Sequence, residues 1–414
     1  MKERVILHAD CNSFYASVEL LKYPELQNKP VAVAGSEDNR HGIILAKNEC
    51  AKAYRVRTAE TVWQARKKCP ELILLPPHRA EYTYYSKWIN AIYNQYTDLI
   101  EPFGIDESWL DITGSWHLFG TSPFEVANKI REEIKEKTKL TISVGISFNK
   151  IYAKLGSDLK KPDAVSEITL ENHRETVFPL PVSALLYVGG KTQETLGRVG
   201  VRTIGQLAEA DTGLLLELFG KMGPELKRYA AGEDDSEVAR YQEGEQVKSV
   251  GNGLTFRRNL VGKKDIELGV VSLADEVAER LRKYGLYAKA VQIQIKDTNL
   301  KSISRQKVLA RAANTSKDLF EAAVSLIYAN WNIEHPVRML TVTAIQLQED
   351  KDAVQLSLWE EPAEQEDKRE KLERSIDHIR ERYGREALLQ GGALHNDIGV
   401  PGLAKPKEQK KKEK

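Results

Sequence analysis

Residues 103–111 read Phe103-Gly104-Ile105-Asp106-Glu107-Ser108-Trp109-Leu110-Asp111 and place two adjacent carboxylates within an apolar stretch. Carboxylates between apolar residues are costly to bury unless they bind cations or pair with basic groups. The stretch therefore predicts one half of a divalent-metal site. The pair alone decides little, because the chain has 60 acidic residues and contains other adjacent pairs, such as Glu132-Glu133.

A third carboxylate, Asp10, follows a short apolar run, Val5 to Ala9, that is rich in strand-forming residues. We expect a buried strand that ends at Asp10, and then a helix from Asn12 to Leu21. Asp10, Asp106 and Glu107 are hard oxygen ligands of the kind that Mg²⁺ or Mn²⁺ needs when substrate phosphates complete the shell. Two such ions assist in-line displacement at phosphorus, so the trio predicts phosphoryl or nucleotidyl transfer. Surface acids at the starts of loops are the simpler alternative.

Strands and helices alternate around these carboxylates. Helical periodicity covers Arg79 to Tyr96, and Ser122-Pro123-Phe124-Glu125 has the form of a capping box that starts a second helix. Thr141 to Ser147 alternates like a half-buried strand, and Asn149 is placed to cap a third helix. This order predicts a mixed sheet with helices on one face, an α+β layer, with the carboxylates at its strand ends. The second helix should bury Phe124, Ala127, Ile130 and Ile134.

Beyond residue 179 the character of the chain changes. Short helices flank Gly189-Gly190-Lys191-Thr192, where glycines before a helix N-terminus let backbone amides approach a phosphate. Residues 232–246 read as a polar linker. A second α+β unit follows, with 16 Lys or Arg against 11 Asp or Glu between residues 248 and 350. We expect a charged helix near residues 368–382 and a disordered lysine-rich end.

Composition narrows the class of protein. A chain of 414 residues is too long for one core and should form roughly three or four domains. The 41% hydrophobic and 29% charged residues are typical of a soluble globular protein. We see no apolar run of about 20 residues and no signal peptide, so we expect a cytoplasmic protein without a membrane span. Cys11, Cys50 and Cys69 are too far apart for a disulfide framework or a CxxC site.

Three long motifs in order resemble those of the Y family of DNA polymerases, most closely its bacterial DNA polymerase IV type. They are His8 to Glu19, Ile105 to Asp111, and Ser143 to Ser147 continued through Asn149-Lys150, Ala153-Lys154 and Asp158 to Pro162. The resemblance covers essentially the whole chain and implies a right-hand polymerase. Its parts would be a ferredoxin-like palm (1–10 and 79–166), small fingers (11–78), a helix-hairpin-helix thumb (167–240), a separate α+β little finger that binds DNA (241–352) and a tail (353–414).

The resemblance also implies a role for individual residues. Asp10, Asp106 and Glu107 would be the catalytic metal ligands for two Mg²⁺ ions, with Glu107 serving the ion nearest the primer hydroxyl. The backbone carbonyl of Cys11 would join the shell. Tyr15 would be the steric gate that excludes a ribose 2′-OH. The other expected contacts to the nucleotide are Asn12, Phe14, Lys52 and Lys161.

The fingers depart from the family's pattern. Where the family usually shows a tyrosine and an arginine that hold the triphosphate, this chain has Glu49 and Lys52. Lysine offers a point charge without the bidentate fork of arginine. Because Glu49 would repel a triphosphate, we expect it either to pair with Lys52 or to turn away, which leaves more of the binding to Lys161.

DNA and a sliding clamp are the expected macromolecular partners. Gln355-Leu356-Ser357-Leu358-Trp359 resembles the pentapeptide by which bacterial polymerases bind the sliding clamp. A helix cap or internal docking is the alternative for that peptide. The expected contacts to primer-template DNA are Gly189, Gly190, Lys191, Thr192, Ser249, Gly251, Thr255, Arg257 and Arg305.

Together these features predict a template-directed DNA polymerase that adds deoxynucleotides (dNTPs) to a primer with low fidelity and copies damaged templates. We expect it to act as a monomer. A nucleotidyl cyclase could use the same two-metal site, but it leaves the hairpin, the basic unit and the pentapeptide unexplained. A non-catalytic DNA-binding scaffold is the third possibility, and the intact acidic trio argues against it.

Overall fold

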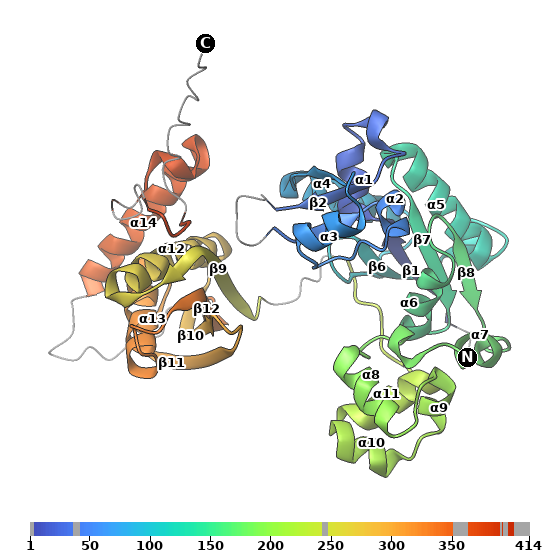
Figure 1. The fold of residues 1–414 in the computed structure, drawn as a ribbon. Helices are drawn as coiled ribbons and strands as arrows, with labels where there is room; N and C mark the ends of the chain where they lie inside the picture. The colour runs from blue at the N-terminus through green and yellow to red at the C-terminus, as the bar shows by residue number, and fades with distance from the viewer. Residues whose placement is uncertain are drawn as a thin grey trace. The chain divides into compact units, whose positions relative to one another are not determined.

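The structure is a computed structural model that describes residues 4–35, 42–241, 247–350, 363–389, 391 and 396–400. The chain divides into two compact units, Met1–Gly244 and Glu245–Lys414. Both units combine sheets with helices, and Figure 1 labels the elements for which there is room.

A five-stranded sheet in the first unit carries the carboxylates. Its strand order is β5-β6-β1-β7-β8. The central strand β1 runs antiparallel to both neighbours and pairs Asp10 with Glu107 on one side and with Ser143 on the other. The sequence prediction that the acidic residues meet at strand ends of one sheet is thereby confirmed. The strands are β1 (Ile6–Cys11), β5 (Ile100–Pro102), β6 (Glu107–Asp111), β7 (Ile142–Ser147) and β8 (Val165–Ile168).

Helices cover both faces of this sheet, so the expectation of helices on one face is wrong. α4 (Arg79–Tyr93) and α5 (Pro123–Thr138) share a core with alternate residues of β1 and β7. α6 (Lys150–Leu159) packs on the opposite face, where the backbone of Gly145 approaches it closely. For the same reason β7 is buried along its whole length and is not the half-buried strand that its alternation predicts. Because side chains alternate along a strand, Asp10 and Glu107 point to the α6 face.

The start of α5 differs in detail from the prediction. The Ser122 side chain accepts a hydrogen bond from the Glu125 amide, as an N-cap should. The Glu125 carboxylate, however, accepts from the Thr121 amide 2.7 Å away, so the capping box is not closed. Phe124 is 45% exposed because the buried face of the helix is formed by Val126, Ala127, Ile130 and Ile134.

Two smaller groups of elements complete the first unit. The first is a three-stranded sheet of order β3-β2-β4 with short helices beside it. It comprises α1 (Phe14–Leu20), β2 (Val31–Ala34), β3 (Ile44–Lys47), α2 (Glu49–Ala53), α3 (Val62–Lys68) and β4 (Ile73–Leu75). The second is helical and comprises α7 (His173–Val177), α8 (Gly190–Arg198), α9 (Ile204–Glu209), α10 (Thr212–Phe219) and α11 (Met222–Ala231).

Residues 233–241 are not the free linker that their polar composition predicts. Val238 is buried against Ile6 and Trp109, on the α6 face of the sheet. The Tyr241 amide donates to the Asp98 carbonyl over 3.0 Å, and Arg240 forms an ion pair with Asp98. The segment is therefore part of the first unit.

The second unit is a four-stranded sheet of order β11-β10-β12-β9 with helices packed on it, as the sequence predicts. Its core is built from alternate strand residues and the apolar faces of two helices. The elements are β9 (Ser249–Leu260), α12 (Gly262–Tyr284), β10 (Tyr287–Asp297), β11 (Ser302–Ala313), α13 (Ser316–Asn330) and β12 (Val337–Gln348).

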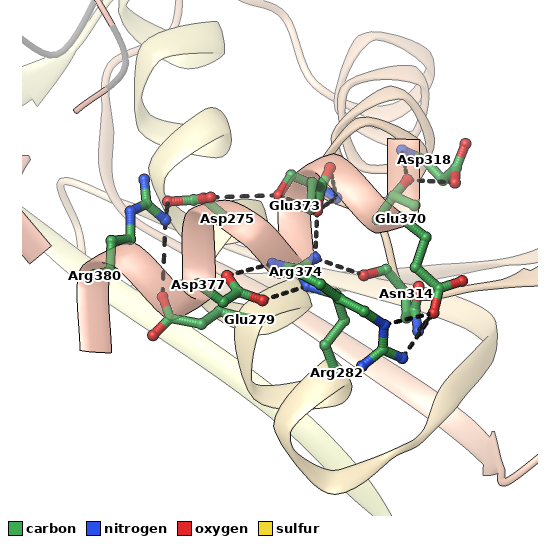
Figure 2. Close-up of polar contacts among 12 residues, drawn as sticks. Asp275, Glu279, Arg282, Asn314, Asp318, Glu370, Glu373, Arg374, Asp377 and Arg380 are labelled. Atoms are coloured by element: carbon green, nitrogen blue, oxygen red, sulfur yellow. Dashed lines mark hydrogen bonds and ion pairs between the residues drawn. The ribbon is translucent and has the colours of Figure 1, made fainter. Parts of the chain in front are cut away.

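A further helix, α14 (Ala363–Tyr383), docks on this unit through buried charges (Figure 2). The Arg282 side chain of α12 is 2% exposed and pairs with Glu373 and with Asp377, the latter over 2.6 Å. Glu373 also accepts from the Ser316 amide at the start of α13, 3.0 Å away. Farther along the chain, Ile398 is buried in the same core. The predicted charged helix is therefore an integral layer of the second unit.

Removing the charge of Arg282 should release α14. Arg282→Met keeps most of the side-chain volume but leaves Glu373 and Asp377 without their buried partner, a loss that typically costs about 3 kcal/mol. We expect amide hydrogen exchange in α14 to accelerate by roughly 100-fold, since 1.4 kcal/mol corresponds to a factor of ten. Arg374→Met is the matched control, because the Arg374 side chain is 48% exposed and its partner, Glu370, belongs to the same helix. Equal protection of α14 in the two variants would contradict the prediction.

Candidate active site

Two lysines compensate the paired carboxylates. Lys161 Nζ lies 2.9 Å from Asp10 and 2.8 Å from Asp158. Lys154, on the inner side of α6, pairs with Glu107. Over the described ranges of the chain, no three His, Cys, Asp or Glu side chains stand close enough together to hold a metal ion as they are placed. The trio nevertheless has the chemistry of a divalent-cation site, since it gathers carboxylates that only positive charge can stabilise.

The pKa values of Asp10 and Asp106 are raised, whereas that of Glu107 is lowered. Burial raises the pKa of Asp106 to about 6, and the neighbouring charges of Asp10 and Glu107 act in the same direction. Burial also raises the pKa of Asp10, against the opposing effect of Lys161. For Glu107, burial is outweighed by contacts with His8 and Lys154, which lower its pKa to about 2. Asp106 is thus the carboxylate with the least compensation.

The raised pKa of Asp106 predicts that the stability of the fold depends on pH. A carboxyl group whose pKa is raised in the folded protein destabilises the fold once it ionises, so the penalty appears as the pH rises from about 4 through 6. In EDTA, Asp106→Asn should therefore stabilise the protein at pH 7.5 by about 1–2 kcal/mol after allowance for solvent screening, and much less at pH 4.8. Urea unfolding at the two pH values measures the difference. A gain of equal size at both would refute the assignment, and Asp98→Asn serves as a surface control.

A buried histidine beside Glu107 was not predicted. His8 is fully buried in β1, and its Nδ1 lies 2.9 Å from Ser157 Oγ. The Ser157 hydroxyl donates to the Lys154 carbonyl, so the His8 Nδ1–H is the donor to Ser157. Nε2 lies 3.3 Å from Glu107 Oε2, and this is the contact by which His8 lowers the pKa of Glu107. Burial lowers the pKa of His8 and is the largest of several effects on it. Its spacing from Asp10 on one strand face was the available sequence signal.

A cavity of about 460 Å³ brings most of the predicted site residues together. One wall is the end of β1 with Asp106 and Lys161, and the other is β3 with α2. The predicted residues on its surface are Asp10, Cys11, Phe14, Tyr15, Lys52, Asp106 and Lys161. Lys47 and Thr58 also line it and were not predicted.

Asn12 is engaged away from the cavity. Its Nδ2 donates to Ser143 Oγ over 2.9 Å, and its Oδ1 accepts from the Asp163 amide over 2.8 Å. These bonds tie the end of β1 to β7 and to the turn after Lys161. Asn12 thus has a supporting position in this structure, and its expected contact with the nucleotide stays a prediction.

Glu49 and Lys52 form an ion pair, one of the two arrangements expected for them. Lys52 Nζ donates to Glu49 Oε1 over 2.5 Å, and Ser13 Oγ donates to the same oxygen over 3.2 Å. Ser13 has a left-handed backbone, with φ of 50°, directly before the helix that carries Tyr15. Glu49 therefore links α2 to the turn at the end of β1.

The Tyr15 ring rests on a second tyrosine that was not predicted. Tyr15 and Tyr82 stack with centroids 4.0 Å apart and planes 10° from parallel. Tyr82 is fully buried and donates its hydroxyl to Glu19, which also accepts from the His78 amide over 3.0 Å. The periodicity of α4 marked Tyr82 only as a core residue. Its contact with Tyr15 depends on tertiary packing.

The predicted DNA contacts lie in both units. Gly189 and Gly190 have open space where a Cβ would lie, and neither has a positive φ. Lys191 follows them in α8, with an exposed side chain, and Thr192 is partly buried. Ser249, Gly251, Thr255 and Arg257 lie on β9, and Arg305 lies on β11, where its Nε donates to Asn330 over 3.1 Å. The expected clamp peptide, Gln355 to Trp359, lies outside the described residues.

None of the helices in the described part of the chain is long and apolar enough to cross a membrane.

Comparisons with known proteins give one consistent result. Residues 9–158 match the impB/mucB/samB family, and residues 247–358 match the C-terminal domain of that family. DNA polymerase IV of Acetivibrio thermocellus is 44% identical over 95% of this chain and 98% of its own length. DNA polymerase IV of Bacillus anthracis is 38% identical over 95% and 94%. A solved Y-family DNA polymerase chimera, Dbh-Dpo4-Dbh, matches the fold with a TM-score of 0.74 at 23% identity, over 84% of this chain and 100% of its own.

Proposed function

This chain belongs to the Y family of DNA polymerases, and from that premise we propose how its residues divide the work of nucleotidyl transfer. It is a DNA-directed DNA polymerase of the translesion class. Membership of this family argues against the two alternative functions, a nucleotidyl cyclase and a non-catalytic DNA-binding scaffold. The observation that carries the proposed division of roles is the pairing of Asp10 with Glu107 at neighbouring strand ends, where Asp10 lines a cavity that three lysines also line.

Asp10, Asp106 and Glu107, with the backbone carbonyl of Cys11, would hold two Mg²⁺ ions, or Mn²⁺ in their place. Such ions supply the positive charge that stabilises the attacking and leaving oxygens of an in-line displacement. Glu107 would orient the site nearest the primer 3′-hydroxyl. The raised pKa of Asp106 supports this assignment, because its environment favours added positive charge.

Lys161 would change partners during the reaction. It pairs with Asp10 and Asp158 in this structure, and the carboxylate charge of Asp10 is the charge that a cation would neutralise. Once that charge is neutralised, the Lys161 ammonium is attracted less strongly to Asp10. It would then pair with the negatively charged triphosphate in the cavity. Lys154 would hold Glu107 in place until the cations bind.

Tyr15 would exclude ribonucleotides, and Tyr82 would hold it in position. Tyr15→Ala should raise the ratio of ribonucleotide to deoxynucleotide incorporation by roughly 100-fold, because a bulky side chain beside the sugar typically contributes about 1–3 kcal/mol of discrimination. Single-nucleotide incorporation of matched rNTP and dNTP measures the ratio. Tyr84→Ala, a change to an exposed tyrosine on the same helix as Tyr82, is the control. An unchanged ratio for Tyr15→Ala would remove the gate role.

DNA would be held by phosphate contacts from both units. The first unit offers Gly189-Gly190 and the start of α8, a helix N-terminus without a side-chain cap, next to Lys191 and Thr192. The second unit offers Ser249, Gly251, Thr255, Arg257 and Arg305. Such binding should weaken steeply with salt. Gln355-Leu356-Ser357-Leu358-Trp359 would bind a sliding clamp and tether a monomeric enzyme to its template.

The domain boundaries follow the same proposal. The five-stranded sheet would be the palm (1–10 and 79–166), the three-stranded sheet the fingers (11–78) and helices α7 to α11 the thumb (167–240). The little finger (241–352) and the tail (353–414) would follow. The division between the two compact units after Gly244 supports the start of the little finger.

Primer extension tests the proposed function. Purified protein, a 5′-labelled primer on a longer template, Mg²⁺ and all four dNTPs should give products whose sequence follows the template. Opposite an abasic site, extension should continue past the lesion. Absence of extension on an undamaged template, with DNA binding retained, would overturn the proposal.

A further inference from the structure

Three lysines line the catalytic cavity, and Lys154 pairs with Glu107, the neighbour in sequence of the cavity residue Asp106. Three of these four lysines have a carboxylate partner. Lys161 pairs with Asp10, Lys154 with Glu107, and Lys52 with Glu49. In each case the ammonium charge is matched by an acid within ion-pair distance. An anionic substrate must therefore compete with an existing partner for each of these three side chains.

Lys47 is the exception in the described part of the cavity. It is the last residue of β3, and its side chain is partly buried. Its Nζ donates to Thr58 Oγ1 over 2.9 Å, a neutral partner that also lines the cavity. No carboxylate of the described residues lies within 4.0 Å of it, the limit at which the other lysines find theirs. Burial, with the nearby charge of Lys52, lowers the pKa of Lys47 against the opposing and weaker effects of the more distant Glu49 and Glu60.

A partly buried ammonium that faces a cavity without a counter-ion favours the approach of an anion. The anion that a DNA polymerase brings into this cavity is the triphosphate of the incoming nucleotide. Lys52 is a weaker candidate, because Glu49 already occupies it and adds a negative charge of its own.

We propose that Lys47 is the principal contact of the fingers with the nucleotide triphosphate and takes the place expected for Lys52. Lys161 lies beside Asp10, where the α-phosphate must meet the metal ligands. Lys47 lies on the opposite wall, in the small sheet. Lys47 therefore contacts the β- and γ-phosphates, which lie farther from the metal ligands. Thr58 positions its ammonium group. This inference rests on the proposed polymerase function.

Nucleotide binding to the full-length protein on a dideoxy-terminated primer-template tests the proposal. Lys47→Met keeps the aliphatic stem and removes the charge. We expect it to weaken dNTP binding by roughly 10-fold or more, the usual loss for a charge-assisted hydrogen bond. Binding of the matching dNDP should weaken less, so the preference for dNTP over dNDP should fall. Lys47→Arg should restore most of the affinity, and Thr58→Val should give an intermediate loss.

Lys67→Met is the matched control and should change dNTP affinity by less than about 3-fold, because Lys67 is an exposed lysine of α3 that does not line the cavity. In steady-state extension, Lys47→Met should raise KM with little change in kcat. If Lys67→Met loses as much affinity as Lys47→Met, or Lys47→Met leaves dNTP affinity unchanged, the assignment to Lys47 is wrong. If the wild type binds DNA but fails to extend a primer, the proposed polymerase function is wrong. That result differs from a failure of the Lys47 assignment, which leaves primer extension by the wild type intact.

Discussion

Asp106→Ala should abolish primer extension, with a fall in the single-turnover rate of roughly 1,000-fold or more. The change removes the central carboxylate of the trio, and several kcal/mol of charge stabilisation at the reacting phosphorus depend on the ions that it would hold. Asp106 lacks a lysine partner among the contacts described above, so its loss exposes no unpaired ammonium. The protein should therefore fold, and the defect should be confined to chemistry. Rapid-quench extension in saturating Mg²⁺ and dNTP measures the rate.

Two controls separate this effect from general damage. Affinity for primer-template DNA, measured without Mg²⁺, should stay within about 3-fold of the wild type, since the proposed DNA contacts lie elsewhere. Asp98→Ala removes a carboxylate that is paired with Arg240 at the surface of the same unit and should leave the rate unchanged. If Asp106→Ala extends a primer within about 10-fold of the wild-type rate, Asp106 is not a metal ligand.

The sequence predicted that the acidic trio lies at strand ends because a strand can be recognised from a few consecutive residues. The apolar run before Asp10 and the stretch around Asp106-Glu107 each predict a strand. Two strands that carry carboxylates at one end can share a bound cation when they lie side by side. The pairing of Glu49 with Lys52 was also predictable, because residues three apart on a helix lie on the same face.

The partners of these carboxylates could not be predicted in the same way. The contact of Lys154 with Glu107 depends on which face of the sheet α6 covers, and the alternation of β7 favoured the wrong answer. The stack of Tyr82 on Tyr15 joins residues 67 positions apart through tertiary packing. Arg282 and Glu373 are separated by 91 positions, and a charged helix ordinarily indicates a solvated surface.

Gly145→Ala should disrupt the first unit, because the approach of β7 to α6 leaves no room for a methyl group. A Cβ at this position would lie 2.0 Å from the Ala153 carbonyl oxygen and 2.3 Å from the Ser157 amide nitrogen. Both are backbone atoms of a helix, so no rotamer change can relieve the overlap. α6 must move away from the sheet, at a cost of about 4 kcal/mol or more. For a unit of this size, that loss lowers Tm by roughly 8 °C or more.

The same displacement should reach the catalytic centre, because α6 carries Lys154 towards Glu107 and ends just before Lys161. Any Gly145→Ala protein that still folds should therefore extend primers poorly, although no catalytic side chain has changed. Gly114→Ala is the matched control, since a Cβ there meets nothing within 4 Å, and its Tm should stay within about 2 °C of the wild type. Should Gly145→Ala behave like Gly114→Ala in both Tm and extension rate, the contact between β7 and α6 cannot be as close as described. The position of Lys154 beside Glu107 would then need another explanation.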